Sequence, residues 1–565
     1  MMKTIHYRME LVNTEASTGY VVCRPEQDMD PEQALGLLRD RPNDTFLHRH
    51  VLETVLSLKR EQAHRTLGDH PVDRAVAAEA AVLDPRGESP FPPPDPAALR
   101  DLARHTPMVD LRCEAMENVG VLREWAELFR RNLLELRPLP RPEDAGITVP
   151  YSRQFLEDLW NSAVPTWKLF QHVPVPEEAG EDVSPERTVE AARERLEAAG
   201  FLADHQEMRH EASLAHLGLL HRWKLDVATS VGTNRHTLAG EPTAYGRGYR
   251  PEYARASLYM EIVERVCAFA SFDADGPVGY STDHGFAHGS LEDLAGQGRK
   301  AVDPNLLRPD APYGGEPLYW VRGASPLPAG GFEDVWVPAQ CVFLFSNLDE
   351  IRLHAGLGST GLASGTTVEQ ARLSALLEVV ERDAEAATPY TPRRCFALEA
   401  RDPNISAILE DYQARGIVVR FMDMTSWLGV PCFKSLVMGK DGVLAKGTDA
   451  KLSGPRAAMS ALAETPYPYP DGPASAVPEK LASVPVRYLE DLLELSRGTL
   501  ADLALLEATF IRNHRAPVYV DLTREDLGLP VVRAVVPQME PMADFDRFSL
   551  PGPRMFAGYL AMWEI

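Results

Sequence analysis

Two short phrases of the sequence repeat one pattern of charge inside apolar surroundings. Residues 257–265 read SLYMEIVER and residues 374–382 read SALLEVVER, and both spell Ser-x-x-x-Glu-x-x-Glu-Arg. At about 100° per residue on a helix, the Ser and both Glu of each phrase fall within an arc of roughly 60°. Nearly all the other residues of the phrases are apolar. The pattern therefore predicts two helices that are buried nearly all round and that each carry two carboxylates on one face.

Buried carboxylates need a neighbouring cation, because an unpaired buried charge costs several kcal/mol. The phrases contain four glutamates, Glu261, Glu264, Glu378 and Glu381. Only Arg265 and Arg382 follow them directly. A hard divalent cation such as Mg²⁺ neutralises surplus carboxylates with oxygen ligands, and together with arginines this favours a nucleoside triphosphate site. One such phrase alone is more typical of a solvated helix face with local ion pairs. The duplication argues against that interpretation, although duplication of a purely structural helix pair stays open.

The residues before each phrase are typical of an anion site. Four glycines lead into the second helix: Gly356, Gly358, Gly361 and Gly365. The spacing of Thr366 to Glu369 fits a capping box that starts this helix. Before the first helix, Arg247 stands between Gly246 and Gly248. Glycine-rich backbone that leads into a helix N-terminus offers N–H groups and a favourable dipole to phosphate.

Other nucleotide or metal motifs fit less well. Residues 356–361 satisfy GxGxxG, but no convincing buried strand precedes them and the helix begins several residues later than in the dinucleotide fingerprint. No GxxxxGK[ST] is present, which excludes a P-loop as a sequence prediction. His284 and His288 have i, i+4 spacing, but Gly285 between them favours a loop over a metal chelate.

The composition excludes several partner classes. The 565 residues carry a formal net charge of −24, which disfavours nucleic acid and anionic membrane surfaces. No segment approaches the ~18 apolar residues of a membrane span, and the six cysteines form no CxxC. These features favour a soluble, cytoplasmic protein with reduced thiols.

The chain is long enough for several folding units. Two short strands around a turn at Thr18 and Gly19, followed by two helices, predict a small α+β N-terminal domain over residues 1–84. A Pro-rich linker and a helical segment follow over 85–174, where PRGESPFPPPDPAA cannot be a helix interior or a central strand. Residues 175–565 form the predicted main domain, in which helices alternate with runs such as GIVVRFMDM and CFKSLVMG. The predicted fold class is α+β, with mixed sheets and buried helices.

The chain resembles the YcaO family over about residues 175–550. The likeness is carried by GRG followed by ASLYMEIVER, by STGLASGTTVEQARLSALLEVVERDA, by AVDP and LYWVRG, and by DLTREDLGLPVVRAVVP. Members of this family use ATP to activate backbone amides of peptides or proteins. The resemblance implies ATP and Mg²⁺ as cofactors, the four glutamates as magnesium ligands, and no protein nucleophile. The implied nucleotide-site residues are Thr188, Arg247, Ser257, Arg265, Thr366, Gln370, Arg382 and Glu464.

Some positions depart from the family pattern. Thr366 stands where Asn is usual, Gln370 where Glu is frequent, and Ser460 where a third-motif Arg is expected. Losing one guanidinium could cost a triphosphate site a few kcal/mol unless Arg456 compensates. The chain also closes with PGPRMFAGYLAMWEI, whereas azoline-forming members tend to end in a proline-rich tail.

The resemblance implies a peptide-modifying enzyme and leaves its product open. Family reactions form azolines, thioamides or amidines, and some members modify ribosomally made peptides. The expected partners are a peptide or protein substrate, a possible TfuA-like protein and a second copy of the chain in a homodimer. The alternative is a catalytically inactive YcaO-like scaffold that binds a peptide or a partner protein.

Overall fold

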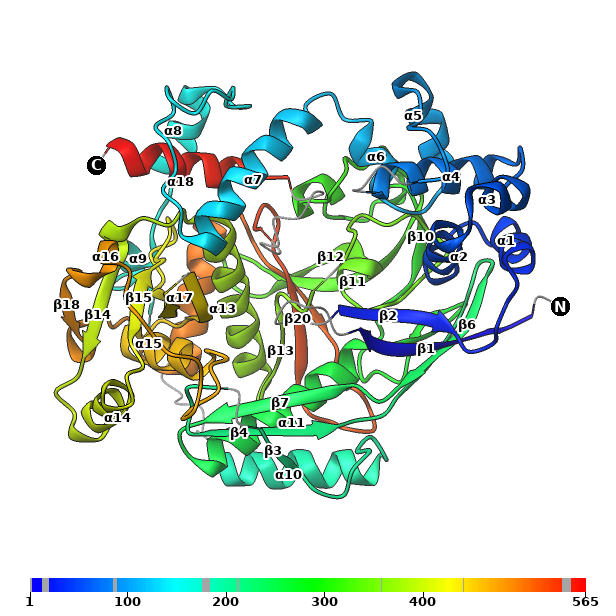
Figure 1. The fold of residues 1–565 in the computed structure, drawn as a ribbon. Coiled ribbons are helices and arrows are strands. Elements are labelled where there is room, and N and C mark those ends of the chain that lie inside the picture. Colours follow the sequence, from blue (N-terminus) through cyan, green and yellow to red (C-terminus); the bar gives the residue numbers. More distant parts are fainter. Residues whose placement is uncertain are drawn as a thin grey trace.

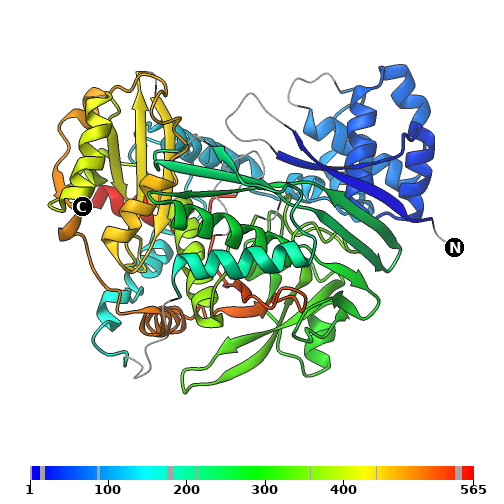
Figure 2. The same ribbon diagram turned by 90° about the horizontal axis from the view of Figure 1, so that it is seen from below.

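The computed structural model describes residues 3–12, 20–84, 89–174, 183–210, 213–356, 358–440, 442–540 and 550–564. Within these residues the chain forms four sheets surrounded by helices, which confirms the predicted α+β class. The N-terminal helices lie on one side of the molecule and the five-stranded sheet on the opposite side (Figures 1 and 2). The two repeated phrases lie on helices between these regions.

The first sheet joins the start of the chain to its middle. Its strand order is β2 (Tyr20–Pro25), β1 (Ile5–Val12), β6 (Asn234–Gly240), β5 (Leu225–Val231), β8 (Ser271–Asp273) and β9 (Gly276–Val278). Strand β1 pairs antiparallel with β2, as the sequence predicts, and parallel with β6. The expected turn at Thr18 and Gly19 lies outside the described residues. The N-terminal strands thus share a sheet with strands of the predicted main domain, and the three domain boundaries stay a prediction.

The second sheet lies at the centre of the molecule. Its order is β10 (Ala287–Gly289), β11 (Leu318–Pro326), β19 (Val518–Asp521), β20 (Val531–Val535) and β13 (Leu362–Ser364), and β12 (Phe332–Pro338) pairs with β11. Strands β20 and β13 pair antiparallel, with Ala363 opposite Val532. Every residue of β20 is buried, as expected for a run of valines in the middle of a fold.

The other two sheets flank this centre. One has the order β17 (Gly442–Ala450), β16 (Cys432–Gly439), β15 (Val419–Asp423), β14 (Cys395–Glu399) and β18 (Val486–Tyr488). The smaller one has the order β3 (Met208–His210), β4 (Leu217–Arg222) and β7 (Thr243–Gly248). The runs GIVVRFMDM and CFKSLVMG form β15 and β16, as predicted.

The helices cover these sheets (Figure 1). Those of the first 200 residues are α1 (Pro31–Asp40), α2 (Thr45–Ser57), α3 (Arg60–Thr66), α4 (Pro71–Leu83), α5 (Pro96–Leu102), α6 (Asp110–Glu114), α7 (Val119–Glu135), α8 (Arg153–Asn161), α9 (Thr166–Leu169) and α10 (Pro185–Ala198). The later ones are α11 (Pro251–Ala268), α12 (Leu291–Gly296), α13 (Val368–Ala387), α14 (Pro403–Ala414), α15 (Gly454–Ala463), α16 (Glu479–Ala482), α17 (Thr499–Arg512) and α18 (Pro553–Glu564). No described helix is both long enough and apolar enough to span a membrane.

A buried polar network fastens the N-terminal helices to the rest of the fold. The Asn347 side-chain oxygen accepts from the backbone N–H of Thr45 at 2.8 Å, and its amide nitrogen donates to Asp44 at 2.9 Å. Asn234 donates to the Asn347 carbonyl at 2.9 Å. Because buried amide groups are costly when unpaired, this set of bonds fixes where α2 begins against the central part of the chain.

The C-terminal helix is held by a buried ion pair. Arg554, in the first turn of α18, pairs with Asp383 of α13, and both side chains are almost fully buried. Asp383 also accepts from the backbone N–H of Glu540 at 2.9 Å. Farther along α18, Phe556 and Tyr559 each lie 5.3 Å from the ring of Trp125 on α7. Helix α18 therefore packs on α7 with its apolar face and on α13 through one charge pair.

Replacing Arg554 by Ala is expected to destabilise the protein by about 3–5 kcal/mol, because it leaves Asp383 as an unpaired buried charge. Arg401→Ala is the control, since Arg401 pairs with Asp491 at 2.6 Å with both side chains more than half exposed. This exposed pair should contribute at most about 1 kcal/mol. Urea unfolding of both variants measures the difference, and equal losses would contradict the assignment.

Candidate functional site

Both helices that carry the repeated phrases pack against the same strands. Helix α11 and helix α13 each contact β13 and β20. The hydroxyl of Ser364 in β13 donates to the Met260 carbonyl on α11 at 3.0 Å. On the other side, the Ala534 N–H donates to the Gly361 carbonyl at 2.7 Å. The strand between the helices thus brings the two phrases together, 117 positions apart in sequence.

Glycine is required where this strand begins. Gly361 has φ +79°, a conformation that side chains disfavour. A Cβ atom there would lie 2.3 Å from the Ala534 carbonyl oxygen. Gly365 is as tightly packed, because a Cβ atom would lie 2.5 Å from the Ala371 nitrogen. These two glycines serve close packing, in addition to any role in anion binding.

The glutamates of α11 lie at the edge of this packing. Glu261 accepts from the Tyr245 N–H at 3.2 Å and lies 3.6 Å from the Arg265 guanidinium. Burial raises the pKa of Glu264 to about 8, against the influence of Arg265, and the negative charge of Glu378 adds to the rise. A backbone hydrogen bond from Ser364 partly opposes it. Glu264 and Glu378, from different helices, therefore interact through their charges.

The glutamates of α13 surround Arg382. Its guanidinium lies 3.2 Å from Glu381, 3.9 Å from Glu378 and 3.1 Å from Glu385. Burial raises the pKa of Glu378, and burial with the nearby Asp449 raises that of Glu381 well above its usual range. Arg382 opposes both shifts but is shared among three carboxylates. The negative charge at this junction is therefore only partly compensated by the protein.

The glutamates are not sealed inside the core. The side chains of Glu261 and Glu381 are 30% and 14% exposed, whereas the apolar residues of both helices are buried. The prediction of apolar burial on these helices is confirmed. The carboxylate faces, in contrast, remain partly open to solvent, so a ligand could reach them.

Arg533 is a site residue that the motif analysis missed. It stands alone among apolar residues in the strand Val531–Val535, is 2% exposed and donates to the Gly358 carbonyl at 2.9 Å. Burial lowers the pKa of Arg533 to about 10, and Glu378 is the strongest influence opposing that change. Its second terminal nitrogen is buried and has no hydrogen-bond partner among the described residues. A single charge within a valine run was the signal that could have identified it.

A second missed group lies where α13 meets the five-stranded sheet. Glu385 accepts from the Thr448 hydroxyl at 2.8 Å and lies 3.4 Å from the Lys434 ammonium group. Burial acts to raise the pKa of Glu385, but Lys434 and Arg382 lower it to about 2. Lys434, like Arg533, is a lone charge in a buried strand. Glu385 is therefore a fully ionised neighbour of the predicted metal ligands.

Two predicted nucleotide-site residues pair with each other. Arg247 in β7 donates to the Glu464 carboxylate at 2.7 Å. Strand β7 lies directly on α11, because a Cβ atom at Gly246 would come 2.2 Å from the Ala254 carbonyl oxygen. Glu464 also raises the pKa of Glu261, for which burial is the largest cause. Arg247 and Glu464 therefore lie beside the carboxylates of α11.

The capping prediction at Thr366 was wrong by one residue. Thr367 is the residue before α13, and its hydroxyl accepts from the Gln370 N–H at 3.2 Å. Thr366 instead donates both its N–H and its hydroxyl to the Gln370 side-chain oxygen, at 2.8 and 2.7 Å. The helix starts later because Gly365 packs against its first turn. Thr366 and Gln370, which both depart from the family pattern, are thus bonded to each other.

The remaining candidates lie farther from this group. Ser257 is exposed on α11, about one turn before Glu261. The Thr188 hydroxyl donates to the Ser184 carbonyl at 3.1 Å, within its own helix α10. No interaction described for either residue links it to the glutamates. The other possible metal ligands separate as well, since His284 bonds to the Asp521 carbonyl and His288 stacks on Tyr319.

The chemistry of these groups fits Mg²⁺ and phosphate, although no finished metal site is present. No three His, Cys, Asp or Glu side chains of the described ranges lie close enough together to hold a metal ion. Magnesium commonly takes only one or two carboxylates and completes its shell with phosphate and water. The raised carboxylate pKa values and the unpartnered nitrogen of Arg533 indicate places for a cation and an anion, respectively. The four predicted metal ligands therefore stay candidates.

Comparison with known proteins identifies the segment that contains these groups. A family model described as YcaO cyclodehydratase, ATP- and Mg²⁺-binding, matches residues 245–467. This segment is a YcaO domain. It contains α11, α13, α15 and all four glutamates of the repeated phrases. ATP and Mg²⁺ are thus the cofactors of the family to which the domain belongs.

Two further proteins are similar to part of this chain. An uncharacterized protein of Methanothermobacter thermautotrophicus is 28% identical over 331 residues, covering 52% of this chain and 81% of the relative. A Rhizobium leguminosarum bv. trifolii protein, described as uncharacterized and in the tfuA 3′ region, is 28% identical over 238 residues. That match covers 40% of this chain and 52% of the relative, so the chain spans about half of its length.

A solved structure shares the fold. A heterocyclase in complex with substrate and cofactor superposes with a TM-score of 0.50 at 19% identity. The match covers 67% of this chain and 56% of the heterocyclase chain. At this identity the comparison concerns the arrangement of helices and strands alone.

The raised pKa of Glu264 predicts how metal-free stability depends on pH. A carboxyl whose pKa is about 8 when folded and near 4.5 when unfolded binds more protons in the folded state between these values. The contribution of this carboxyl to the stability of the folded state is therefore fully present below pH 4.5 and is lost as the pH rises through 8. Glu264→Gln should flatten this dependence and stabilise the protein by about 1–2 kcal/mol at pH 8.

Thermal unfolding in EDTA at pH 5 and pH 8 measures the effect. Glu252→Gln, in the first turn of the same helix, is the matched control and should leave the pH profile unchanged. An identical profile for the Glu264 variant and the wild type would contradict the assigned environment of this carboxyl.

Proposed function

We propose that the chain is an enzyme that uses ATP and Mg²⁺ to activate a backbone amide of a peptide or protein. The observation that carries the proposal is the junction of α11 and α13, where four partly exposed glutamates share too few arginines. Family membership of residues 245–467 supplies the reaction class. In this reaction a nucleophile adds to the amide carbonyl, the γ-phosphoryl group of ATP is transferred to the resulting oxygen anion, and phosphate is then lost.

The residues of the junction have distinct tasks in this proposal. Glu261, Glu264, Glu378 and Glu381 would hold Mg²⁺, which neutralises phosphate oxygens when bound. Arg265 and Arg382 orient these carboxylates through the contacts already described. Arg533 supplies a buried positive charge near Glu378 and has one terminal nitrogen without a hydrogen-bond partner among the described residues. Catalysis would thus depend on positioning and charge neutralisation, without a protein nucleophile.

The substrate and partners of the enzyme are proposed on separate grounds. A peptide or protein substrate follows from the family chemistry, with thioamide, azoline or amidine as the product. A TfuA-like partner is supported by the name of the Rhizobium relative, which places it in the tfuA 3′ region. We also propose that the chain forms a homodimer in the cytoplasm.

A second function, an inactive scaffold that binds a peptide or a partner protein, is favoured by one set of observations. Thr366 and Gln370 bond to each other, so neither is held ready for a ligand. Ser460 replaces an expected arginine, and Arg456 is exposed and forms no ion pair within the described residues. The retained glutamates favour the enzyme over this scaffold.

Substituting the glutamates tests the enzyme directly. Glu264→Gln and Glu381→Gln should each lower the rate of ATP hydrolysis by about 100-fold or more, because each removes charge needed to hold the metal and the phosphates. Hydrolysis is measured as phosphate release by the full chain, with Glu252→Gln and Glu369→Gln as controls on the same two helices. Equal rates in all variants would reject the site.

Equilibrium binding separates the enzyme from the scaffold. Binding of a non-hydrolysable ATP analogue should be at least about tenfold tighter with Mg²⁺ than with EDTA, a difference of about 1.4 kcal/mol. Isothermal titration calorimetry measures both constants. No detectable binding in either condition would favour the scaffold and remove the basis for catalysis.

A further inference from the structure

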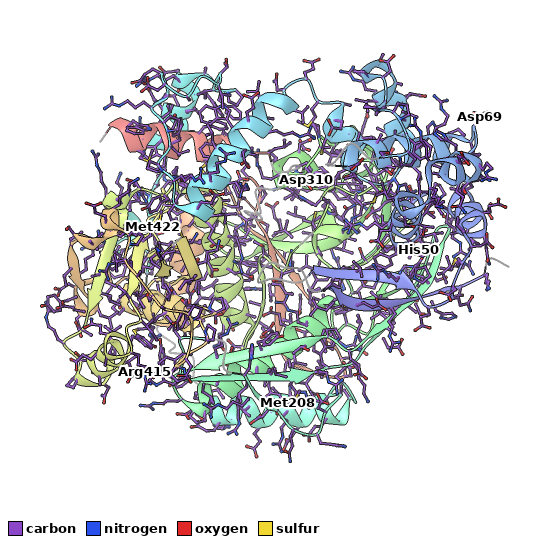
Figure 3. The ribbon with its side chains drawn as sticks, in the orientation of Figure 1. His50, Asp69, Met208, Asp310, Arg415 and Met422 are labelled. Carbon is purple, nitrogen blue, oxygen red and sulfur yellow. The ribbon has the colours of Figure 1, made fainter. Side chains whose placement is uncertain are left out.

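A cavity lies between the N-terminal helices and the central part of the chain. Its volume is about 280 Å³, and it is enclosed by β2, α2 and the segment 340–356. Figure 3 labels His50, which lies on α2 and lines this cavity. A space of this size approaches that of small-ligand sites.

The cavity combines an apolar wall with charged side chains, namely three arginines and Glu53. Phe46, Met108 and Phe343 contribute apolar surface, and Arg49 and Arg352 also line the space. Arg49 is anchored by a bond of 2.7 Å from its guanidinium to the Ala355 carbonyl. The Arg352 N–H donates to the Pro107 carbonyl at 2.8 Å, which fixes the backbone of that residue.

Neither arginine forms an ion pair with a carboxylate among the described residues, although the charge of Arg49 lowers the pKa of the nearby Asp110. Burial lowers the pKa of Arg352 to about 10, and the nearby charge of Arg49 lowers it further. Glu350 is the strongest influence that opposes this shift. Burial raises the pKa of Glu350 to about 8, however, so this carboxyl is largely uncharged at neutral pH. Both guanidinium groups also oppose the rise that burial causes in the pKa of the Cys23 thiol, which lines the same space. The two positive charges therefore face one cavity with only partial compensation.

A third arginine at the cavity provides an internal comparison. Arg24 also lines the space but lies 3.3 Å from Glu53 and 3.6 Å from Glu10. Its charge is therefore already balanced by exposed carboxylates. The unbalanced charge of the cavity comes from Arg49 and Arg352 alone among these three residues.

We propose that this cavity binds a small organic anion, in which a carboxylate or phosphate pairs with Arg49 and Arg352 and a compact apolar group packs on Phe46 and Phe343. Guanidinium groups suit planar or tetrahedral oxyanions, and apolar walls exclude competing water. An anion would also relieve the repulsion between the two arginines. None of the four glutamates of the proposed ATP site lines this cavity.

The test uses the full-length protein and three probes: 4-bromophenylacetate, 4-bromophenyl phosphate and the uncharged 4-bromobenzyl alcohol. Titration calorimetry should detect one or both anions and not the alcohol. Arg352→Gln and Arg49→Gln should each weaken anion binding by about 10- to 100-fold, since each removes a charge-assisted contact. Arg24→Gln combined with Glu53→Gln removes a paired charge at the same cavity and is the matched control, which should change anion binding by less than about threefold.

Crystals of the wild-type protein soaked with the bound anion give a readout that does not depend on variants. Bromine should appear by anomalous scattering beside Phe46 and Phe343. The relative affinities of the carboxylate and the phosphate identify the head group that the site prefers. Equal binding of the alcohol, unchanged affinity in both arginine variants, or bromine found only elsewhere would each overturn the proposal.

Discussion

The electrostatic imbalance at the junction of α11 and α13 is the constraint on which the proposed activity depends. Burial raises the pKa values of four glutamates there, and each arginine that opposes the rise is shared among several carboxylates. A fold selected for stability alone would gain by replacing such groups with apolar ones. Their presence on two helices with the same spacing is what the proposed ATP and Mg²⁺ site requires.

The central sheet makes this imbalance possible. Strand β13 and the glycine before it donate backbone hydrogen bonds to glutamates of both helices, from Ser364 to Glu264 and from Gly361 to Glu378. Strand β20 supplies Arg533 from the opposite side. Since β20 lies late in the chain, the site is completed only when residues near 361 and near 533 pair. The same sheet therefore supports the fold and orients the charged groups.

The positions that depart from the family pattern concern the rim of this site more than its centre. Thr366 and Gln370, two of the departing positions, bond to each other, and Glu464, which matches the family pattern, pairs with Arg247. A nucleotide must either fit beside these pairs or exchange with them. The cavity at Arg49 and Arg352 has the opposite character, because neither of these two cations forms an ion pair with a carboxylate among the described residues. The two places thus differ in composition, one with more carboxyl groups than arginines and the other with more arginines than carboxylates.

The sequence by itself determined the two helices, their carboxylate faces and the family, because these depend on local periodicity and on motifs of fixed spacing. It also predicted the β1–β2 pair and the strands β15 and β16 from short apolar runs. It missed Arg533, Lys434 and Glu385, whose importance arises from contacts between distant segments, and it misplaced the start of α13 by one residue. Only the tertiary structure decided these points. The effect of a charge depends on its burial and its neighbours, and both are set by how β20, β13 and β16 pack around the two helices.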